Sequence, residues 1–492
     1  MDWREATAAI NEKQNVKQCR QQYGWSLRSA VAVLLALCAA TVSSADEVAW
    51  EHAPYRIHAL LAIDAPGGLS AQLHELLPEY LGQRIHTSIG PVWSFDTELA
   101  TGGSRHRILT GIATASEEPS ESFSAAGDKL LLLSVRATPL GYELTGREYD
   151  RYLERWGLPV RRTCRQLGAL PEQLFALVWQ VVAPLVRLEL DPQDEHRIVL
   201  LPRGAGLPRK SPDVEFARPG DIFLPALRRI TREGEVVPDG IEFVPWTYIE
   251  TAPPSEDGVL AGQIHSGTRR PFGVRRRGRI EQVAIALRSD PANTAVRLHS
   301  RTDPNKPLVD YDVFTKNTSE STTAPLGSSD TSGRIIVPPG KSRVQLLYVK
   351  HGGALLARFP IVPGAQPQVD VPLPDDDIRL QAEARLAALR EELVDVVARR
   401  NILMSRVKQD IEDRDFDDAQ TLLVALDQLP GRSQFNQQLS REARLHRSDD
   451  PQIQQRIDRL IATTQVVLSQ YLDTRQVSDL HDELRAAKSG GS

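Results

Sequence analysis

Apolar residues recur at every second position through most of the chain and at every third or fourth position in its C-terminal part. The clearest stretch is 326–364, where three apolar runs are separated by turn-forming residues. The second and third runs, 344–349 and 354–359, flank Gly352 and Gly353. Glycine adopts the positive φ angles that a tight hairpin requires, so the sequence predicts two paired strands here.

Strand and helix patterns are mixed in the segment 46–196. Alternating apolar residues predict a strand at 55–63, and apolar residues three or four apart predict helices at 69–81 and 171–182. Residues 101–128 are rich in serine, glycine, alanine and glutamate without periodicity, which favours a long mobile loop. The order of elements predicts an α+β domain over 46–196, with a mostly antiparallel sheet.

Short apolar runs with frequent proline and glycine continue as far as residue 374. Residues 197–281 read as irregular short strands, which predicts a small β-barrel domain. Residues 282–374 resemble the immunoglobulin-like or prealbumin-like β-sandwich modules that are common in exported bacterial proteins. An apolar strand at 307–314 and a turn of aspartate and glycine at 330–335 carry this resemblance.

The composition changes at Asp375, because only Pro430 and Pro451 of the 33 prolines lie beyond it. Residues 375–492 show helical spacing, and the first helix carries one apolar seam that Arg400 interrupts. The second helix stops before Pro430, and the pair resembles one helical hairpin of a tetratricopeptide-like repeat. We therefore expect a multi-domain α+β protein with an α-helical hairpin tail, a separable unit that packs on itself, on the sandwich or on a protein partner.

The first 45 residues have the pattern of a signal peptide. Positive residues precede a short apolar run at 30–40, and small residues follow at Ser43 and Ala45. Removal of 1–45 leaves Cys164 as the one cysteine, so no internal disulfide is expected. The pattern predicts an exported protein, in the periplasm, on the cell surface or secreted, with no transmembrane segment after the leader.

The composition and the remaining motifs narrow the function only partly. The net charge of −5 makes nucleic acid an unlikely partner. His265, His299 and His351 lack metal-ligand spacing, and the sequence contains no HExxH or CxxC pair. We therefore predict no catalytic residue, no cofactor and no metal site. The alternative is a secreted or periplasmic hydrolase whose active site is not marked by a contiguous motif.

Arginine is concentrated in one segment, 269–279. The candidate ligand-binding residues are Arg269, Arg270, Phe272, Arg275, Arg276, Arg277 and Arg279. Guanidinium groups bind phosphate and carboxylate in a bidentate manner, and an aromatic ring offers a flat partner. An anionic polysaccharide or another envelope component could dock here. The alternative is that these are solvated arginines on a barrel hairpin, paired with acidic groups elsewhere.

Taken whole, the chain resembles an uncharacterised family of exported bacterial proteins with a leader, an α+β domain, a small barrel, a sandwich and a helical tail. The segments that carry the resemblance are 218–223, 244–247, 275–279, 346–350 and 372–377. The family has no known activity, so the resemblance implies only this layout. The order of an α+β domain and a barrel is also similar to envelope accessory proteins such as flagellar assembly protein T. We expect an exported, non-enzymatic binding or structural protein of the cell envelope.

Overall fold

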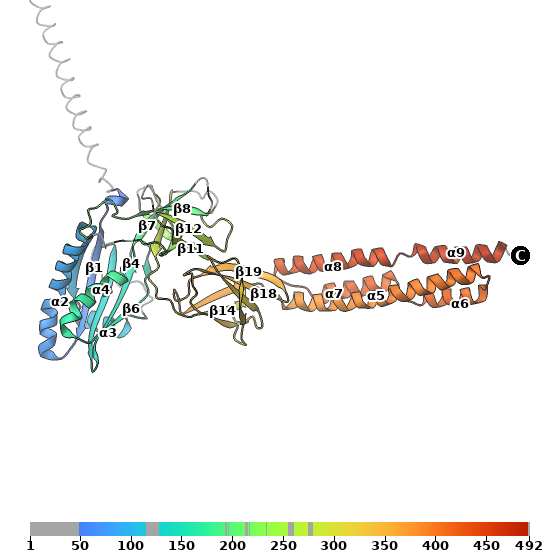
Figure 1. Ribbon diagram of the computed structural model, residues 1–492, viewed down its shortest axis with the longest axis horizontal. Coiled ribbons are helices and arrows are strands. Elements are labelled where there is room, and N and C mark those ends of the chain that lie inside the picture. The colour runs from blue at the N-terminus through green and yellow to red at the C-terminus, as the bar shows by residue number, and fades with distance from the viewer. Residues whose placement is uncertain are drawn as a thin grey trace, which may run out of the picture.

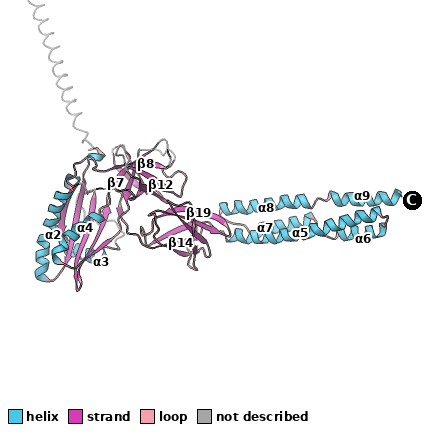
Figure 2. Ribbon diagram, viewed as in Figure 1, coloured by secondary structure: helices cyan, strands magenta, loops and turns pink. Residues whose placement is uncertain are grey.

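The chain combines helices and sheets, with a closed barrel and a set of C-terminal helices (Figure 1). The computed structural model describes residues 49–114, 127–191, 194, 196–211, 215, 217–232, 234–253, 260–273 and 279–490. The predicted leader, 1–45, and the arginines at 275–277 lie outside these residues. Figure 2 shows strands in the N-terminal and middle parts, with helices beside the N-terminal sheet, while helices alone form the elongated C-terminal part.

The first sheet has six strands, in the order β2–β1–β3–β4–β5 with β6 also paired to β4. Their bounds are β1 Tyr55–Asp64, β2 Trp93–Leu99, β3 Lys129–Thr138, β4 Gly141–Asp150, β5 Arg155–Trp156 and β6 Val160–Cys164. The expected antiparallel pairing holds between β3 and β4 and between β4 and both β5 and β6. Strand β1 is parallel to β2 and β3, because a helix crosses over between each successive pair.

Helices cover both faces of this sheet. The bounds here are η1 Trp50–His52, α2 Gly67–Ser88, η2 Gly90–Val92, α3 Gly102–Gly111, η4 Leu167–Ala169 and α4 Leu170–Val181. Helix α3 lies where we expected a long loop, 101–128, so that expectation was wrong for its first part. The helix buries Ile108 against the sheet, and the following residue Ile112 is also buried. Few apolar residues and three glycines give this helix no detectable apolar period.

The second sheet closes on itself as a barrel of six strands. The ring runs β9–β11–β12–β8–β7–β13 and returns to β9, with β10 attached to β9 outside the ring. Their bounds are β7 Leu185–Leu190, β8 Arg197–Pro202, β9 Ile222–Ile230, β10 Val236–Phe243, β11 Thr247–Thr251, β12 Ala261–Ser266 and β13 Arg279–Ala286. Strand β7 precedes the boundary expected at residue 197, and β13 crosses the one expected at 281.

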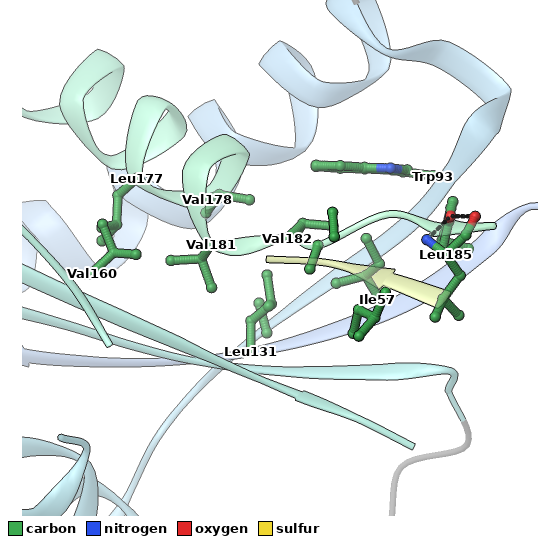
Figure 3. Close-up of a cluster of buried hydrophobic side chains, with 14 of the residues drawn as sticks. Ile57, Trp93, Leu131, Val160, Leu177, Val178, Val181, Val182 and Leu185 are labelled. Carbon is green, nitrogen blue, oxygen red and sulfur yellow. Dashed lines mark hydrogen bonds between the residues drawn. The ribbon is translucent and has the colours of Figure 1, made fainter. Parts of the chain in front are cut away.

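One apolar core connects the first sheet to the barrel. Figure 3 shows Ile57 and Leu131 of the first sheet beneath Val178 of α4, with Leu185 of the barrel strand β7 in the same cluster. The cluster continues inside the barrel to Phe223, which is fully buried. Burial of apolar surface stabilises by about 25 cal/mol per Å², so a shared core joins these two parts firmly.

Two small sheets enclose a second core beyond the barrel. One has the order β17–β14–β20 and the other β16–β15–β18–β19. Their bounds are β14 Thr294–Ser300, β15 Asp312–Asn317, β16 Ala324–Ser328, β17 Arg334–Val337, β18 Gln345–His351, β19 Ala354–Ile361 and β20 Gln368–Leu373. The predicted hairpin is confirmed: β18 pairs with β19, and Gly352 and Gly353 have φ of 51° and 81°. The immunoglobulin-like or prealbumin-like identity of this unit stays a prediction.

The C-terminal helices form an elongated bundle rather than one hairpin (Figure 1). Their bounds are α5 Asp377–Glu412, α6 Phe416–Asp427, α7 Arg432–Leu445, α8 Pro451–Tyr471 and α9 Arg475–Gly490. The first half of α5 shares a core with α7 and α8, and its second half shares one with α6 and α9. Arg400 lies on α5 between these two cores, and its guanidinium donates to the carbonyl of Asp473, in the break between α8 and α9. The residue that interrupts the apolar seam therefore marks the joint between two layers of the bundle.

A buried polar joint fixes α5 to the sandwich. Asp376 is fully buried and accepts two hydrogen bonds from Arg379, at 2.8 and 2.7 Å. The backbone N–H of Asp376 donates to the hydroxyl of Tyr311, and the ring of Tyr311 stacks on His351 at 4.1 Å. Arg379 also donates to the carbonyl of His351. The change of composition at residue 375 therefore coincides with a tight joint.

Candidate anion-binding cleft

A cavity of about 720 Å³ opens where the barrel meets the sandwich. Strand β12 and the turn after it form one wall, and residues at or near β15, β18 and β19 form the other. The lining residues are His196, Gln263, Ile264, His265, Ser266, Gly267, Thr268, Arg269, Arg270, Pro271, Lys316, Thr318, Leu346 and Arg358. Most of these side chains are polar or positively charged, and none is a carboxylate.

Gly267 lets the two walls approach each other. A Cβ atom at this position would lie 3.2 Å from the Cβ atoms of both Trp246 and Phe359. The rings of these two residues are in contact, with 4.8 Å between their centroids. The backbone N–H of Gly267 donates to the carbonyl of Trp246 at 2.8 Å. A larger side chain would have to push the sandwich away from the barrel.

The hydroxyl of Ser266 holds the turn that presents the arginines. It lies 2.8 Å from the hydroxyl of Thr247 on β11 and 3.1 Å from that of Thr268. It also accepts a hydrogen bond from the backbone N–H of Thr268 at 3.1 Å. These bonds satisfy the hydroxyl of Ser266 at the end of β12. They fix the turn that immediately precedes Arg269 and Arg270 in the chain.

Four cations from two domains converge on this cleft. Arg269 and Arg270 are exposed on the barrel wall, and Lys316 and Arg358 lie on the sandwich wall. Within the described part of the chain, the side chains of Arg269, Arg270 and Lys316 make no ion pair or hydrogen bond. Arg358 lies over the ring of Tyr348, with 5.7 Å from its guanidinium carbon to the ring centroid. Among the described residues that line it, the cleft therefore holds several cations and no carboxylate.

The predicted arginine cluster contributes only in part to the cleft. Arg269 and Arg270 line it, whereas Arg279 is exposed at the start of β13 and is not part of the lining. Phe272 is partly buried against the barrel core, so packing occupies the ring proposed as a flat partner. Arg275, Arg276 and Arg277 lie outside the described residues.

Sequence reasoning missed the opposite wall. Lys316 and Arg358 are single cations within strand patterns, far from the arginine cluster along the chain. No local signal distinguishes them, because it is the packing of the sandwich on the barrel that brings them to Arg269 and Arg270.

The groups of the cleft are able to contact an anion. His265 is paired to Glu250 at 3.0 Å, and the described residues show no hydrogen bond between His265 and its neighbour Ser266. Cations with hydroxyl and amide groups can hold an anion by charge-assisted hydrogen bonds, without an activated nucleophile.

Across the described residues, no group of three or more His, Cys, Asp or Glu side chains could hold a metal ion. None of the described helices is both long and apolar enough to cross a bilayer.

Comparison with known proteins gives no family. No protein-family model matches the chain, and no curated protein matches it. One similar solved structure is TolB from Acinetobacter baumannii, with 11% sequence identity over 65% of this chain and 96% of that chain. The TM-score is 0.17, so this likeness carries no argument about fold or function.

Proposed function

We propose that this chain is an exported, non-enzymatic protein of the cell envelope that binds an anionic polysaccharide in the cleft between the barrel and the sandwich. One observation carries the proposal. Arg269, Arg270, Lys316 and Arg358 line a single cavity, and none of the described residues that line it is a carboxylate. Like charges repel, so an arrangement of this kind is favourable when an anion occupies it.

The other groups of the cleft favour a saccharide over a lipid. The hydroxyls of Ser266, Thr268 and Thr318 and the amide of Gln263 can bond to sugar hydroxyls. The cavity is open to solvent and only a few apolar side chains contribute to it, so acyl chains would find little surface to contact.

Binding of dextran sulfate, with uncharged dextran as the matched probe, tests the proposal. We expect the protein to bind dextran sulfate and not dextran. We also expect the affinity to fall steeply as salt shortens the Debye length to about 8 Å at physiological ionic strength. The double variant Arg269→Gln/Arg270→Gln should lose at least tenfold in affinity, because about 1.4 kcal/mol of lost interaction is tenfold in binding.

A control variant removes the same charge elsewhere. Arg399 and Arg406 are exposed on α5, so Arg399→Gln/Arg406→Gln should bind as the natural protein does. Equal losses in both variants would mean that only net charge matters. That outcome would overturn the cleft as the site. Binding to anionic lipid vesicles but not to dextran sulfate would overturn the saccharide assignment.

A further inference from the structure

A lysine and two carboxylates are enclosed together in the first sheet. Lys129 of β3 is fully buried, as are Glu148 and Asp150 of β4. The Nζ atom of Lys129 donates to Glu148 Oε1 at 2.5 Å, to Asp150 Oδ2 at 2.6 Å and to the carbonyl of Ala183 at 2.8 Å. Lys129 and Asp150 are direct partners in the register of the two strands. The amine and the carboxyl are therefore held in contact by the backbone.

The surrounding atoms hold both carboxylates in place and keep water out. Asp150 Oδ1 accepts from the backbone N–H of Leu153 at 2.8 Å, and Glu148 Oε2 accepts from that of Ala183 at 2.7 Å. The ring of Tyr55 lies 5.5 Å from the amine. Positioned reacting groups in a site without water react with an effective molarity of about 10⁵ M or more.

The proton inventory of the three groups suits a condensation. Burial raises the pKa of Glu148 to about 7, against the attraction of Lys129. Burial alone would lower the pKa of Lys129, but the attraction of Asp150 and Glu148 more than offsets it, so that pKa lies above its ordinary value. With Glu148 protonated, the cluster is electrically neutral. The raised pKa of Lys129 keeps the ammonium as the dominant form, so the reacting form is the minor one in which one proton has passed to Asp150. That transfer places an amine beside a carboxylic acid with no change of net charge in the buried site.

We propose that Lys129 and Asp150 condense to an intramolecular amide, with Glu148 carrying the proton. The lone pair of Nζ attacks Cγ of Asp150, which forms the N–C bond. The carbonyl oxygen of the protonated Glu148 carboxyl accepts a proton from the nitrogen while its O–H gives its own proton to the departing hydroxyl. The C–OH bond breaks, water is released, and Glu148 ends protonated as it began. Nothing is oxidised or reduced, and no further reactant is needed.

Asp150 is the electrophile because of its position. It faces Lys129 directly across the ladder, and the Leu153 N–H already polarises its second oxygen. A backbone donor at that oxygen stabilises the charge that develops as the nitrogen attacks. Glu148 belongs to the same face of β4, two residues away, and so lies within reach of both reacting groups.

Mass spectrometry of the purified full chain tests this directly. The intact protein should be lighter than its sequence by one water molecule. Trypsin cleaves after free lysine but not after an amide-linked one, so digestion should give one branched peptide of residues 108–136 joined to 148–151. Fragmentation should place the branch on Asp150. An unmodified mass with normal cleavage after Lys129 would overturn the proposal, and a branch on Glu148 would overturn the assignment of the electrophile.

Two variants separate chemistry from folding. Lys129→Arg retains a cation between the carboxylates but cannot form this amide, so it should fold and keep its full sequence mass. Glu148→Gln retains both reacting groups but has no carboxyl to carry the proton, so the branched peptide should fall at least tenfold in yield. Folded Glu148→Gln protein with an undiminished yield would show that Glu148 does not carry the proton, contrary to the proposal. The wild-type mass remains decisive if either variant fails to fold.

Discussion

Charge is concentrated at two places in the molecule: the cluster of Lys129, Glu148 and Asp150, and the cationic cleft. The two places differ in burial and in pairing. In the first sheet, Lys129 is fully buried and every donor and acceptor around it has a partner. In the cleft, Arg269 and Arg270 are exposed and have no ion-pair partner among the described residues. An unpaired buried charge costs several kcal/mol, so a fold removes such charges from its interior. An unpaired exposed charge costs little, so it can be kept for a ligand.

The two buried arginines of the helical tail, Arg379 and Arg400, also differ from the exposed arginines of the cleft. Arg379 lies at the sandwich joint, where its Nε and one terminal nitrogen donate to Asp376 and the other terminal nitrogen donates to Glu383. Arg400 lies between the two layers of the bundle and donates to a single backbone carbonyl. Each buried arginine therefore occupies a joint between packed parts, where the backbone or a carboxylate receives it. The cleft differs from these joints because its cations line an open cavity and not a packed contact.

The largest expected effect comes from breaking the buried cluster. Lys129→Met leaves Glu148 and Asp150 buried with neither a cation nor an amide partner. Loss of the buried ion pair alone should lower the free energy of unfolding by about 3–5 kcal/mol, and loss of the proposed amide would add to that difference. Urea unfolding followed by circular dichroism measures the loss. Lys408→Met on the exposed face of α5 is the control and should stay within about 0.5 kcal/mol. Equal behaviour of the two variants would refute the contrast.

A second effect appears at alkaline pH. Burial raises the pKa of Tyr55 from 10.0 to about 12, despite the nearby charge of Lys129. Between these pH values the unfolded chain loses the phenolic proton while the folded chain keeps it. The stability contribution is therefore present below pH 10 and is lost as the pH rises towards 12, by about 3 kcal/mol.

The variant Tyr55→Phe tests this slope. It removes the titrating hydroxyl, so the fall in unfolding free energy above pH 10 should be smaller than in the natural protein. Below pH 10 the variant should be destabilised by about 1 kcal/mol, because the backbone N–H of Leu185 loses its acceptor at 2.8 Å. The exposed residue Tyr471 supplies the control, since Tyr471→Phe should leave the slope unchanged. An unchanged slope in Tyr55→Phe would show that another group titrates.

Sequence patterns predicted the elements well where one local signal determines them. Gly352 and Gly353 predict the β18–β19 hairpin because only the turn chemistry is needed. The helices beyond residue 375 follow from apolar spacing and from the loss of proline. Helix α3 was missed because its sequence carries three glycines and its contact with the sheet depends on Ile108. The sequence signal is local, whereas that contact is tertiary.

Only the barrel wall of the candidate site could be predicted from the sequence. The arginine cluster is visible in the sequence because Arg269 and Arg270 are adjacent to further arginines. Lys316 and Arg358 become part of the cleft only through the packing of two domains, which a sequence pattern does not encode. Lys129, likewise, reads as an ordinary strand lysine until its register with Asp150 is known. Both sites are formed by contacts between residues that lie far apart in the sequence.

A smaller loss is expected at the joint between the sandwich and the tail. Arg379→Met leaves the fully buried Asp376 without its cation, although Asp376 keeps its backbone bond to Tyr311. Because one fully buried carboxylate loses its cation here, against two in Lys129→Met, we expect a smaller loss of about 2 kcal/mol. Limited proteolysis should then release the helices faster than in the natural protein. Arg385→Met, exposed on the same helix, should leave the cleavage rate unchanged.

The smallest effect on stability is expected in the cleft itself. Arg269→Gln/Arg270→Gln removes two exposed cations that have no ion-pair partner, so the free energy of unfolding should change by no more than about 0.5 kcal/mol. The change should be towards greater stability, because Lys316 and Arg358 lie in the same cavity and repel these arginines. Salt screens that repulsion, so the difference between variant and natural protein should vanish at high ionic strength. Thermal unfolding at low and high salt measures both. A destabilised variant would show that the arginines are paired within the fold, and the cleft would then follow the same rule as Lys129.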